Sequence, residues 1–429
     1  MLAQTIKTCK KIPFLTEPIY RNSINLILAT VINSIIGFIF WLVAARVYAP
    51  TDVGIASTLI SAMSLIAIFA YLGFNVSLIR FLPHTPNAEK LFNTATSICS
   101  LLTVTFCLLF IVWTSGGLKD LKILCSEGTF SVLFIFFSVA WVISNLQNSV
   151  FIAKRASRFV LVKETTFGLS KLFFLIPLTL IGSFGIFSAW GIGTVIALVV
   201  GLIFVKGLIP NYKPYFCVEK NMLKDVFTFS FFNYIAWVFN YLPAFLLPII
   251  ITYMADPTST AYFYICWMIA NVLFIVPLQT SQSLFAEGSN NINKLRESIK
   301  KSLIIVCLLL TPGILGLIIT GKYILMIFGS EYSTNGSDLL NILAISAFFY
   351  AINIIFISIN KVRQENRVVV IISGIIGCIA LFGSYLLLPT SGLIGVGQSW
   401  LIANLIPALA ILIMHSRDMI EVFKEPIKN

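Results

Sequence analysis

The sequence predicts an all-α integral membrane protein with twelve transmembrane helices in two six-helix lobes related by a pseudo-two-fold axis. Three observations lead to this prediction: the composition, the length of the apolar stretches and an internal repeat. Of the 429 residues, 58% are hydrophobic and only 11% are charged, and the mean hydropathy is +0.96. Soluble domains have about 25% charged residues, so this composition indicates a protein of the lipid bilayer.

Twelve apolar stretches have about the twenty residues that a helix needs to cross a hydrocarbon core roughly 30 Å thick. Backbone groups in lipid must be hydrogen-bonded within the chain, and the stretches lack the two-residue alternation of a membrane β-strand. We therefore expect helices rather than a barrel. The expected spans are 23–45, 53–80, 91–113, 129–152, 165–182, 185–206, 227–252, 259–286, 301–320, 337–359, 367–388 and 393–415.

Landmarks of the first half of the chain recur, in order, at a constant offset of 207 residues in the second half. Duplicated six-helix halves are common in secondary transporters, where two similar lobes rock about a site between them. We therefore place an N-lobe at 1–210 and a C-lobe at 211–429, with the linker at 207–226. The matched pairs are Ser23 and Ser230, Asn33 and Asn240, Pro50 and Pro257, Asn75 and Gln282, and Gly185 and Gly392.

The basic residues fall mostly on one side of the predicted membrane. Of the 29 Lys and Arg, 24 belong to the tails and alternate loops on one side, and four to the opposite loops. This positive-inside asymmetry predicts a multi-pass protein of the cell membrane (plasma or inner membrane) with both termini in the cytoplasm. It also accounts for the net charge of +12 without a nucleic-acid partner, because no loop is long enough for a nucleic-acid-binding domain.

The residues that enzymes and metal sites require are not grouped in this sequence. The eight cysteines are scattered without a CxxC pair, and the two histidines lie far apart. The sequence has no Walker A loop, no nucleophile with a histidine partner and no paired carboxylates. We therefore expect a transporter rather than an enzyme, with no cofactor and no metal ion.

The acidic residues are expected to avoid the membrane interior. All seventeen Asp and Glu, Glu164 among them, fall in predicted loops or at predicted helix ends. A carrier that binds organic cations, or that couples to protons or Na⁺, usually keeps a carboxylate within the membrane. The predicted interior is therefore neutral to positive, which suits an anionic substrate.

Three cations are candidates for contact with that substrate. Lys171 is the one cation within a predicted span; its long stem could carry the charge to the interface, or its ammonium could bind phosphate in a cavity. Arg46 and Arg80 end the first and second spans on opposite sides of the membrane. They act either as interface anchors or as bidentate phosphate ligands at the two ends of the route.

Amide and aromatic side chains gather on the first, second, seventh and eighth predicted spans. Such groups bind sugar hydroxyls and sugar faces, but they also hold membrane helices together, and both interpretations apply to any one residue. As a set, they favour a hydrated substrate cavity between the lobes. The candidates are Asn25, Asn33, Asn75, Asn233, Trp237, Asn240, Gln279 and Gln282.

Four stretches resemble the polysaccharide exporters, or oligosaccharide flippases, of the multidrug/oligosaccharidyl-lipid/polysaccharide superfamily. Residues 45–57 are similar to the family's first outer loop, where a proline and an acidic residue precede a glycine, and residues 72–80 to the end of its second helix. Residues 328–332 resemble the motif before its tenth helix, and residues 392–397 the start of its last. The resemblance implies a MATE-like fold with a central cavity, and translocation of an undecaprenyl- or dolichyl-pyrophosphate-linked glycan.

The expected function is a flippase that moves a polyprenyl-pyrophosphate oligosaccharide from the inner to the outer leaflet by alternating access. The expected partners are that lipid-linked oligosaccharide, membrane lipids and glycan assembly proteins, and we expect a monomer. One alternative is a MATE-like multidrug or cation antiporter. The other is a membrane glycan polymerase or ligase, which the short outer loops disfavour.

Overall fold

The computed structural model describes residues 18–117, 121–122, 124, 128–210, 212–290 and 295–414. Within these ranges the side chains of residues 18–24, 27, 117, 220–233, 286 and 290 are not described. All the regular structure of the described residues is helical. The helices are α2 (Pro18–Val47), α3 (Pro50–Tyr71), α4 (Phe74–Phe81), α5 (Ala88–Gly117), α7 (Gly128–Ala153), α8 (Arg158–Leu175), the 3-10 helix η3 (Thr179–Ile181), α9 (Ser183–Leu208), α10 (Lys220–Met254), α11 (Pro257–Asn290), α12 (Leu295–Phe328), α13 (Ser330–Val362) and α14 (Asn366–Met414).

Each of the twelve predicted spans overlaps one or two of these helices. The second span is divided between α3 and α4 at Gly73, whose φ is 85°, and α14 carries the last two spans, which separate at Gly392. Within the described residues, ten helices are long and apolar enough to cross a membrane, with α14 counted as one. Helix α8 is not among them, because Arg158, Lys163, Glu164 and Lys171 are charged and the helix has only 18 residues.

The fifth span begins earlier than the sequence predicts. We expected it at 165–182, but α8 runs from Arg158 to Leu175. The error arose because a hydropathy window begins after the charged residues Lys163 and Glu164. These two residues therefore lie inside a helix, and the expectation that Glu164 belongs to a loop or a helix end is wrong.

The repeat is visible in the helices of both halves. Pro50 is the first residue of α3, and Pro257 is the first residue of α11, at the predicted offset of 207. Proline is favoured at this position because the first helical residue needs no backbone N–H donor. Helices α5 and α12 begin at Ala88 and Leu295, again 207 residues apart.

The register of the last helix in each half differs from the prediction. Gly182, directly before α9, has φ 58° and ψ −134°, and Gly392 has φ 57° and ψ −143°. These two breaks are 210 residues apart, and so are Trp190 and Trp400. The structural partner of Gly392 is therefore Gly182 rather than Gly185. Three additional residues precede the final helix of the second half, and a match by residue type alone does not detect them.

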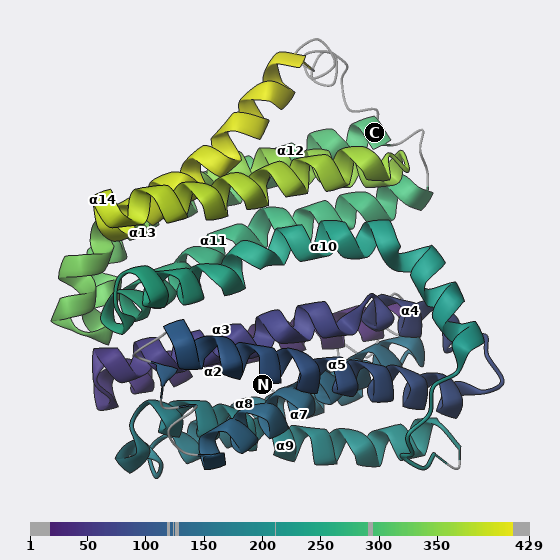
Figure 1. Ribbon diagram of the computed structural model, residues 1–429. Helices are drawn as coiled ribbons and strands as arrows, with labels where there is room; N and C mark the ends of the chain where they lie inside the picture. Colours follow the sequence, from purple (N-terminus) through teal and green to yellow (C-terminus); the bar gives the residue numbers. More distant parts are fainter. Residues whose placement is uncertain are drawn as a thin grey trace, which may run out of the picture. The chain divides into compact units, whose positions relative to one another are not determined.

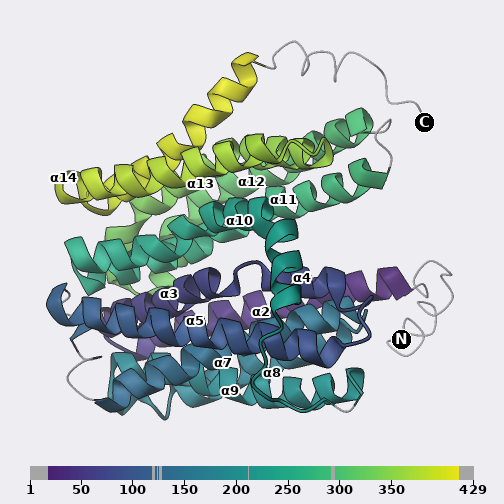
Figure 2. The same ribbon diagram turned by 45° about the vertical axis from the view of Figure 1, so that its right-hand side comes forward.

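The contacts divide the chain into two compact units. Unit 1 comprises Met1–Tyr48 and Met63–Phe231, and unit 2 comprises Ala49–Ala62 and Phe232–Asn429. In unit 1, α8 packs against α2 and α9, while α7 packs against α5 and α9 (Figure 1). In unit 2, α13 packs against α11, α12 and α14, as the turned view also shows (Figure 2). The division into lobes at residue 210 stays a proposal.

The first part of α3 is packed into unit 2 through its backbone and hydroxyl groups. A Cβ atom added to Gly54 would lie 1.7 Å from the carbonyl oxygen of Pro257, so only glycine permits this approach. The hydroxyl of Thr252 lies 2.6 Å from that of Thr58 and 2.8 Å from that of Thr260, and all three threonines are buried. This chain of hydroxyls joins α3, α10 and α11.

The segment between α9 and α10 lies against α5 within unit 1. The side-chain amide of Asn93 donates to the Lys213 carbonyl (2.9 Å), and the Cys217 backbone N–H donates to the Ser97 hydroxyl (3.1 Å). Burial, followed by the nearby Glu89 carboxylate, raises the pKa of Tyr212 to about 12. The predicted linker is thus bound along α5 over residues 212–219.

Candidate functional site

A buried region of unit 1 that contains charged side chains is centred on α8. The buried residues of this helix are Val160, Lys163, Phe167, Gly168, Lys171 and Leu175. Their spacing of three or four residues places them along one face. That face packs against α2 and α9, so two lysines of a single helix point into the interior of the unit.

Lys163 is fully partnered. Its side chain is 1% exposed, and its Nζ donates to the backbone carbonyl and to the hydroxyl of Ser144 on α7. Nζ also lies 3.5 Å from Oε1 of Glu164, and this same oxygen accepts a hydrogen bond of 2.8 Å from the Asn148 amide. The carboxylate offsets the lysine charge, and α7 supplies the remaining hydrogen bonds.

Lys171 has aromatic neighbours instead. Its Nζ lies 4.0 Å from the ring centroid of Trp190, 4.4 Å from that of Phe167 and 5.2 Å from that of Phe40. We call these three rings the aromatic cage. The side chain is 2% exposed, so the ammonium is enclosed and does not extend to an interface. The negative ring faces attract it by cation–π interaction.

The aromatic cage provides no hydrogen-bond acceptor. Phenylalanine and tryptophan rings carry no carbonyl, hydroxyl or carboxylate group, so they hold the ammonium through their faces alone. The buried indole N–H of Trp190 has no hydrogen-bond partner among the described residues. Trp41 and Trp141 extend the cluster, with their ring centroids 6.4 and 6.0 Å from that of Trp190. Lys171 is thus a buried cation surrounded mainly by apolar rings.

Asn33 and Asn240 occupy equivalent places in the repeat but have different surroundings. The Asn240 amide nitrogen donates to the Ala236 carbonyl and to the Ser373 hydroxyl, both at 2.9 Å, so it joins α10 to α14 inside unit 2. The Asn33 side-chain oxygen, in unit 1, is buried and accepts no hydrogen bond from the described residues. A role of either amide in a cavity stays a prediction.

The other candidates are distributed over several helices. Trp237 is half-buried, with its ring centroid 5.2 Å from that of Tyr241. Gln279 and Gln282 are exposed on α11. The side chain of Asn233 lies outside the described residues.

The remaining candidates belong to the first two spans. Asn25 and Asn75 are half-buried on α2 and α4. Arg46 is exposed in the last turn of α2, and Arg80 is exposed in the last turn of α4, where its guanidinium carbon lies 5.7 Å from the Phe81 ring centroid. The two arginines thus occupy the helix ends that the sequence predicted.

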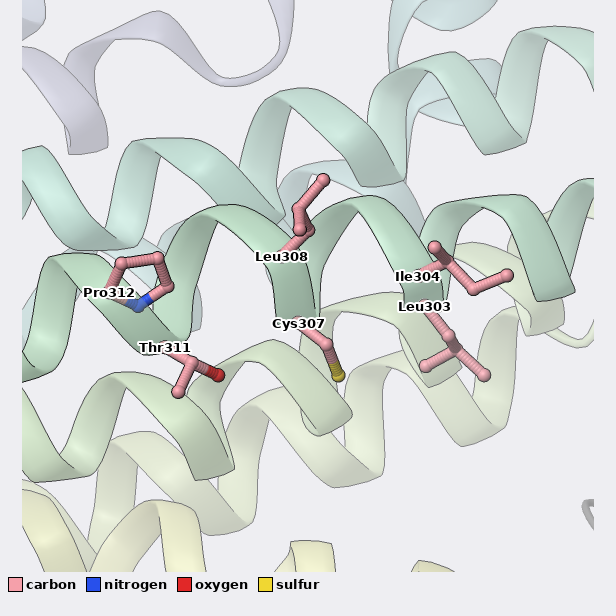
Figure 3. Close-up of a pocket in the computed structure, with 6 residues that line it drawn as sticks. All are labelled: Leu303, Ile304, Cys307, Leu308, Thr311 and Pro312. Atoms are coloured by element: carbon pink, nitrogen blue, oxygen red, sulfur yellow. The ribbon is translucent and has the colours of Figure 1, made fainter.

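A surface depression on α12 contains none of the predicted residues. Its lining residues all come from this one helix, around the internal Pro312, and their side chains are almost entirely apolar (Figure 3). Ile304 and Leu308 are exposed there. These features are typical of a helix surface that contacts lipid tails. The residues are Leu303, Ile304, Cys307, Leu308, Thr311 and Pro312.

Sequence reasoning missed the partners of the buried charges. Lys163, Glu164 and Trp190 were not among the candidates. Lys163 nevertheless shares the buried face of α8 with Lys171, Glu164 contacts Lys163, and Trp190 contacts Lys171. The available signal was the spacing of eight residues between Lys163 and Lys171, which places both on one helix face. In the described ranges, no group of three or more His, Cys, Asp and Glu side chains is placed to hold a metal ion.

The chain matches a known family over most of its length. A family model described as "Polysaccharide biosynthesis protein" matches residues 19–285. The chain belongs to this family. A curated relative, a putative O-antigen transporter of Shigella flexneri, is 27% identical over 150 residues. That alignment covers 34% of this chain and 35% of the relative, so it spans about a third of each.

Three solved transporter structures have the same fold as this chain. The lipid II flippase MurJ in an inward closed conformation matches with a TM-score of 0.75 at 15% identity, over 92% of this chain and 88% of that chain. A MATE-family multidrug transporter in an inward-facing conformation matches with a TM-score of 0.67 at 14% identity, over 95% and 99%. A superfamily transporter from Pyrococcus furiosus matches with a TM-score of 0.63 at 13% identity, over 95% and 96%. The predicted all-α, MATE-like fold is thereby confirmed.

Proposed function

We propose that this protein is a flippase that moves a polyprenyl-pyrophosphate-linked oligosaccharide from the inner to the outer leaflet of the cell membrane by alternating access. Membership of the polysaccharide biosynthesis family and the fold shared with a lipid II flippase support a lipid-linked glycan as the substrate. The protein would act as a transporter, without catalysing a reaction.

The proposal of an anionic substrate rests on the charge balance inside unit 1. The buried face of α8 holds two lysines, Lys163 and Lys171, and the adjacent carboxylate of Glu164 offsets one of them. When Lys171 is protonated, this interior has excess positive charge and favours a pyrophosphate over an organic cation. It also disfavours the multidrug antiporter, because the one carboxylate of this region is engaged by Lys163 and Asn148.

The candidate residues have assigned roles in this proposal. The amides of α2, α4, α10 and α11, with Trp237, would line the route of the sugars between lobes 1–210 and 211–429. Arg46 and Arg80 lie in the last turns of α2 and α4, on opposite predicted sides of the membrane. They would receive the pyrophosphate at the end and at the start of the route, respectively, since guanidinium groups bind phosphate bidentately. The lipid tail would remain in the bilayer.

The membrane potential can assist this transport. Movement of one elementary charge across 100 mV is worth about 2.3 kcal/mol. Export of a headgroup with two negative charges from an inside-negative cell is therefore favourable by about 4–5 kcal/mol per 100 mV. A membrane glycan polymerase or ligase would gain nothing from this term, so potential dependence distinguishes a carrier from an enzyme.

Reconstitution tests the proposal. The purified protein is inserted into vesicles that contain fluorescent lipid-linked glycans in both leaflets, and a reductant that cannot cross the membrane bleaches the accessible headgroups. We expect complete bleaching with the protein and bleaching of one leaflet without it. A parallel assay follows organic cations. Movement of the cations without movement of the glycans would reject the flippase and support the antiporter.

Three variants test the role of Arg46. Arg46→Gln should slow flipping, whereas Lys322→Gln, which removes another exposed cation of the predicted outer side, should leave the rate unchanged. Equal rates for both variants would remove Arg46 from the route. Arg46→Lys, which retains the charge but loses the bidentate geometry, should be intermediate.

A further inference from the structure

The ammonium of Lys171 is enclosed within unit 1. Direct contact with the substrate headgroup therefore does not explain a role of this residue in transport. The aromatic cage of Phe40, Phe167 and Trp190 surrounds Nζ, and these three rings carry no hydrogen-bond acceptor group. A buried ammonium without an anion is costly. A lysine can relieve this cost by releasing its proton, which an arginine cannot do.

The neighbouring lysine on the same face provides an internal comparison. Lys163 has a carboxylate at 3.5 Å and two acceptors on Ser144, so its charge is held in place. Glu164 precedes Lys171 by seven residues, which is about 10 Å along a helix axis. The one carboxylate of α8 therefore contacts Lys163 directly, whereas only a longer-range attraction from it reaches Lys171, whose direct neighbours are the rings.

The helices packed against Lys171 bring few other titratable groups. Helix α7 contains no Asp, Glu, His, Lys, Arg, Tyr or Cys. Helix α9 contributes Lys206 in its last turn, and α2 contributes Arg46 in its last turn, with Tyr20 and Arg21 in its first turns. After α2, the Tyr48 hydroxyl donates to the Leu175 carbonyl (2.5 Å) at the end of α8.

We propose that Lys171 is a proton-exchange site and that its proton exchange accompanies flipping; the second part rests on the proposed flippase function. When the aromatic cage opens to water, the ammonium transfers its proton to a water molecule, giving a neutral amine and a hydronium ion, or the amine takes a proton back. The neutral amine enters the closed cage without the cost of burying a charge. The pH on the side to which the cage opens therefore shifts the balance between its open and closed forms.

The first experiment needs no substrate. An ammonium 4.0 Å from the Trp190 ring centroid alters the emission of the indole, so its deprotonation should appear as a step in tryptophan fluorescence during a pH titration of the purified protein. Lys171→Met, which has a chain of similar length, and Lys171→Arg, which keeps its charge, should both lose the step. Trp190→Phe should lose it as well.

Lys206→Met provides the matched control, because Lys206 is an exposed lysine on α9, and it should keep the step. Lys171→Gln serves as a second uncharged variant if Lys171→Met does not fold, as judged by gel filtration. A wild-type protein without a step, or a step that persists in the folded uncharged variants, would overturn the proton site.

The second experiment measures flipping in vesicles under opposite pH gradients. The wild-type rate should differ between the two gradients, and Lys171→Met should give one rate under both. Equal wild-type rates would overturn the coupling of proton exchange to flipping. If no glycan moves under any condition, the proposed function fails, while the fluorescence titration still decides whether Lys171 exchanges a proton.

Discussion

At the scale of single residues, Lys163 and Glu164 show that a helix can bury a charge when the charge has a partner. The side chain of the lysine is 1% exposed and that of the glutamate 20% exposed. In addition to the other's charge, Lys163 donates a hydrogen bond to Ser144 of α7, and Glu164 accepts one from Asn148 of α7. Removing one member of a buried ion pair is costly because it leaves the other uncompensated, whereas replacing both by apolar residues is often tolerated.

We predict that Glu164→Gln lowers the free energy of unfolding by about 3–5 kcal/mol, because Lys163 then lacks its counter-charge. The double variant Lys163→Met with Glu164→Leu should recover most of this loss. Thermal unfolding in detergent measures both.

The matched control for this prediction is the exposed pair of Glu297 and Lys301, whose atoms lie 2.7 Å apart with side chains 32% and 56% exposed. Glu297→Gln should change the free energy of unfolding by less than about 1 kcal/mol. Equal effects of Glu164→Gln and Glu297→Gln would show that the α8 pair is not buried in the folded protein.

The sequence predicted only part of this site. Lys171 could be identified because it is a single cation in an apolar stretch. Glu164 could not, because hydropathy averages over all sides of a helix and therefore ended the span at the charges. The hydrogen bond from Asn240 to Ser373 joins residues 133 positions apart, and no local pattern specifies such a contact.

Among the elements, the breaks between helices determine which segments can lie side by side. The starts of α3 and α11, the second helices of the two halves, can be predicted because Pro50 and Pro257 occupy the first helical position, which proline favours. The break at Gly392 was predicted in place but not in register, since three extra residues before it are not visible without the backbone angles. The local sequence thus predicts where a helix begins better than it predicts the length of the segment that precedes the helix.

We predict that Gly392→Ala destabilises the protein by about 1–3 kcal/mol, because an alanine at φ 57° and ψ −143° is strained. No atom lies within 4 Å of a Cβ added at this position, so the whole effect comes from the backbone. Chemical or thermal unfolding in detergent measures it.

Gly316→Ala is the control for the backbone effect. Gly316 lies within α12, also has open space around an added Cβ, and has no positive φ. Alanine is the better helix former by about 1 kcal/mol, so this variant should be neutral or stabilising. A loss of stability at Gly316 equal to that at Gly392 would argue against strain as the cause.

At the scale of the whole molecule, the charge asymmetry predicts the orientation in the membrane. The 24 basic residues on one side should hold both termini in the cytoplasm. Reporter fusions after Asn429 and within the 114–128 loop should therefore report opposite sides of the membrane. Reports from the same side would contradict the predicted topology and the inner-to-outer direction of transport.

The membership of Ala49–Ala62 in unit 2 has a consequence for how the chain can be cut. A fragment of residues 220–429 contains α10 to α14 but lacks Gly54 and Thr58, so it leaves the start of α11 and the hydroxyl of Thr252 uncovered. We predict that this fragment is unstable when expressed alone, and that co-expression with residues 1–219 rescues it as a complex that purifies through a tag on either piece.

Gly54→Leu in the first piece should weaken the formation of this complex, because the approach to the Pro257 carbonyl leaves no room for a side chain. Gly37→Leu, with open space around its Cβ, should not weaken it. A stable, monodisperse 220–429 fragment would mean that the second half of the chain completes its own core. The start of α3 would then not be required for the folding of unit 2.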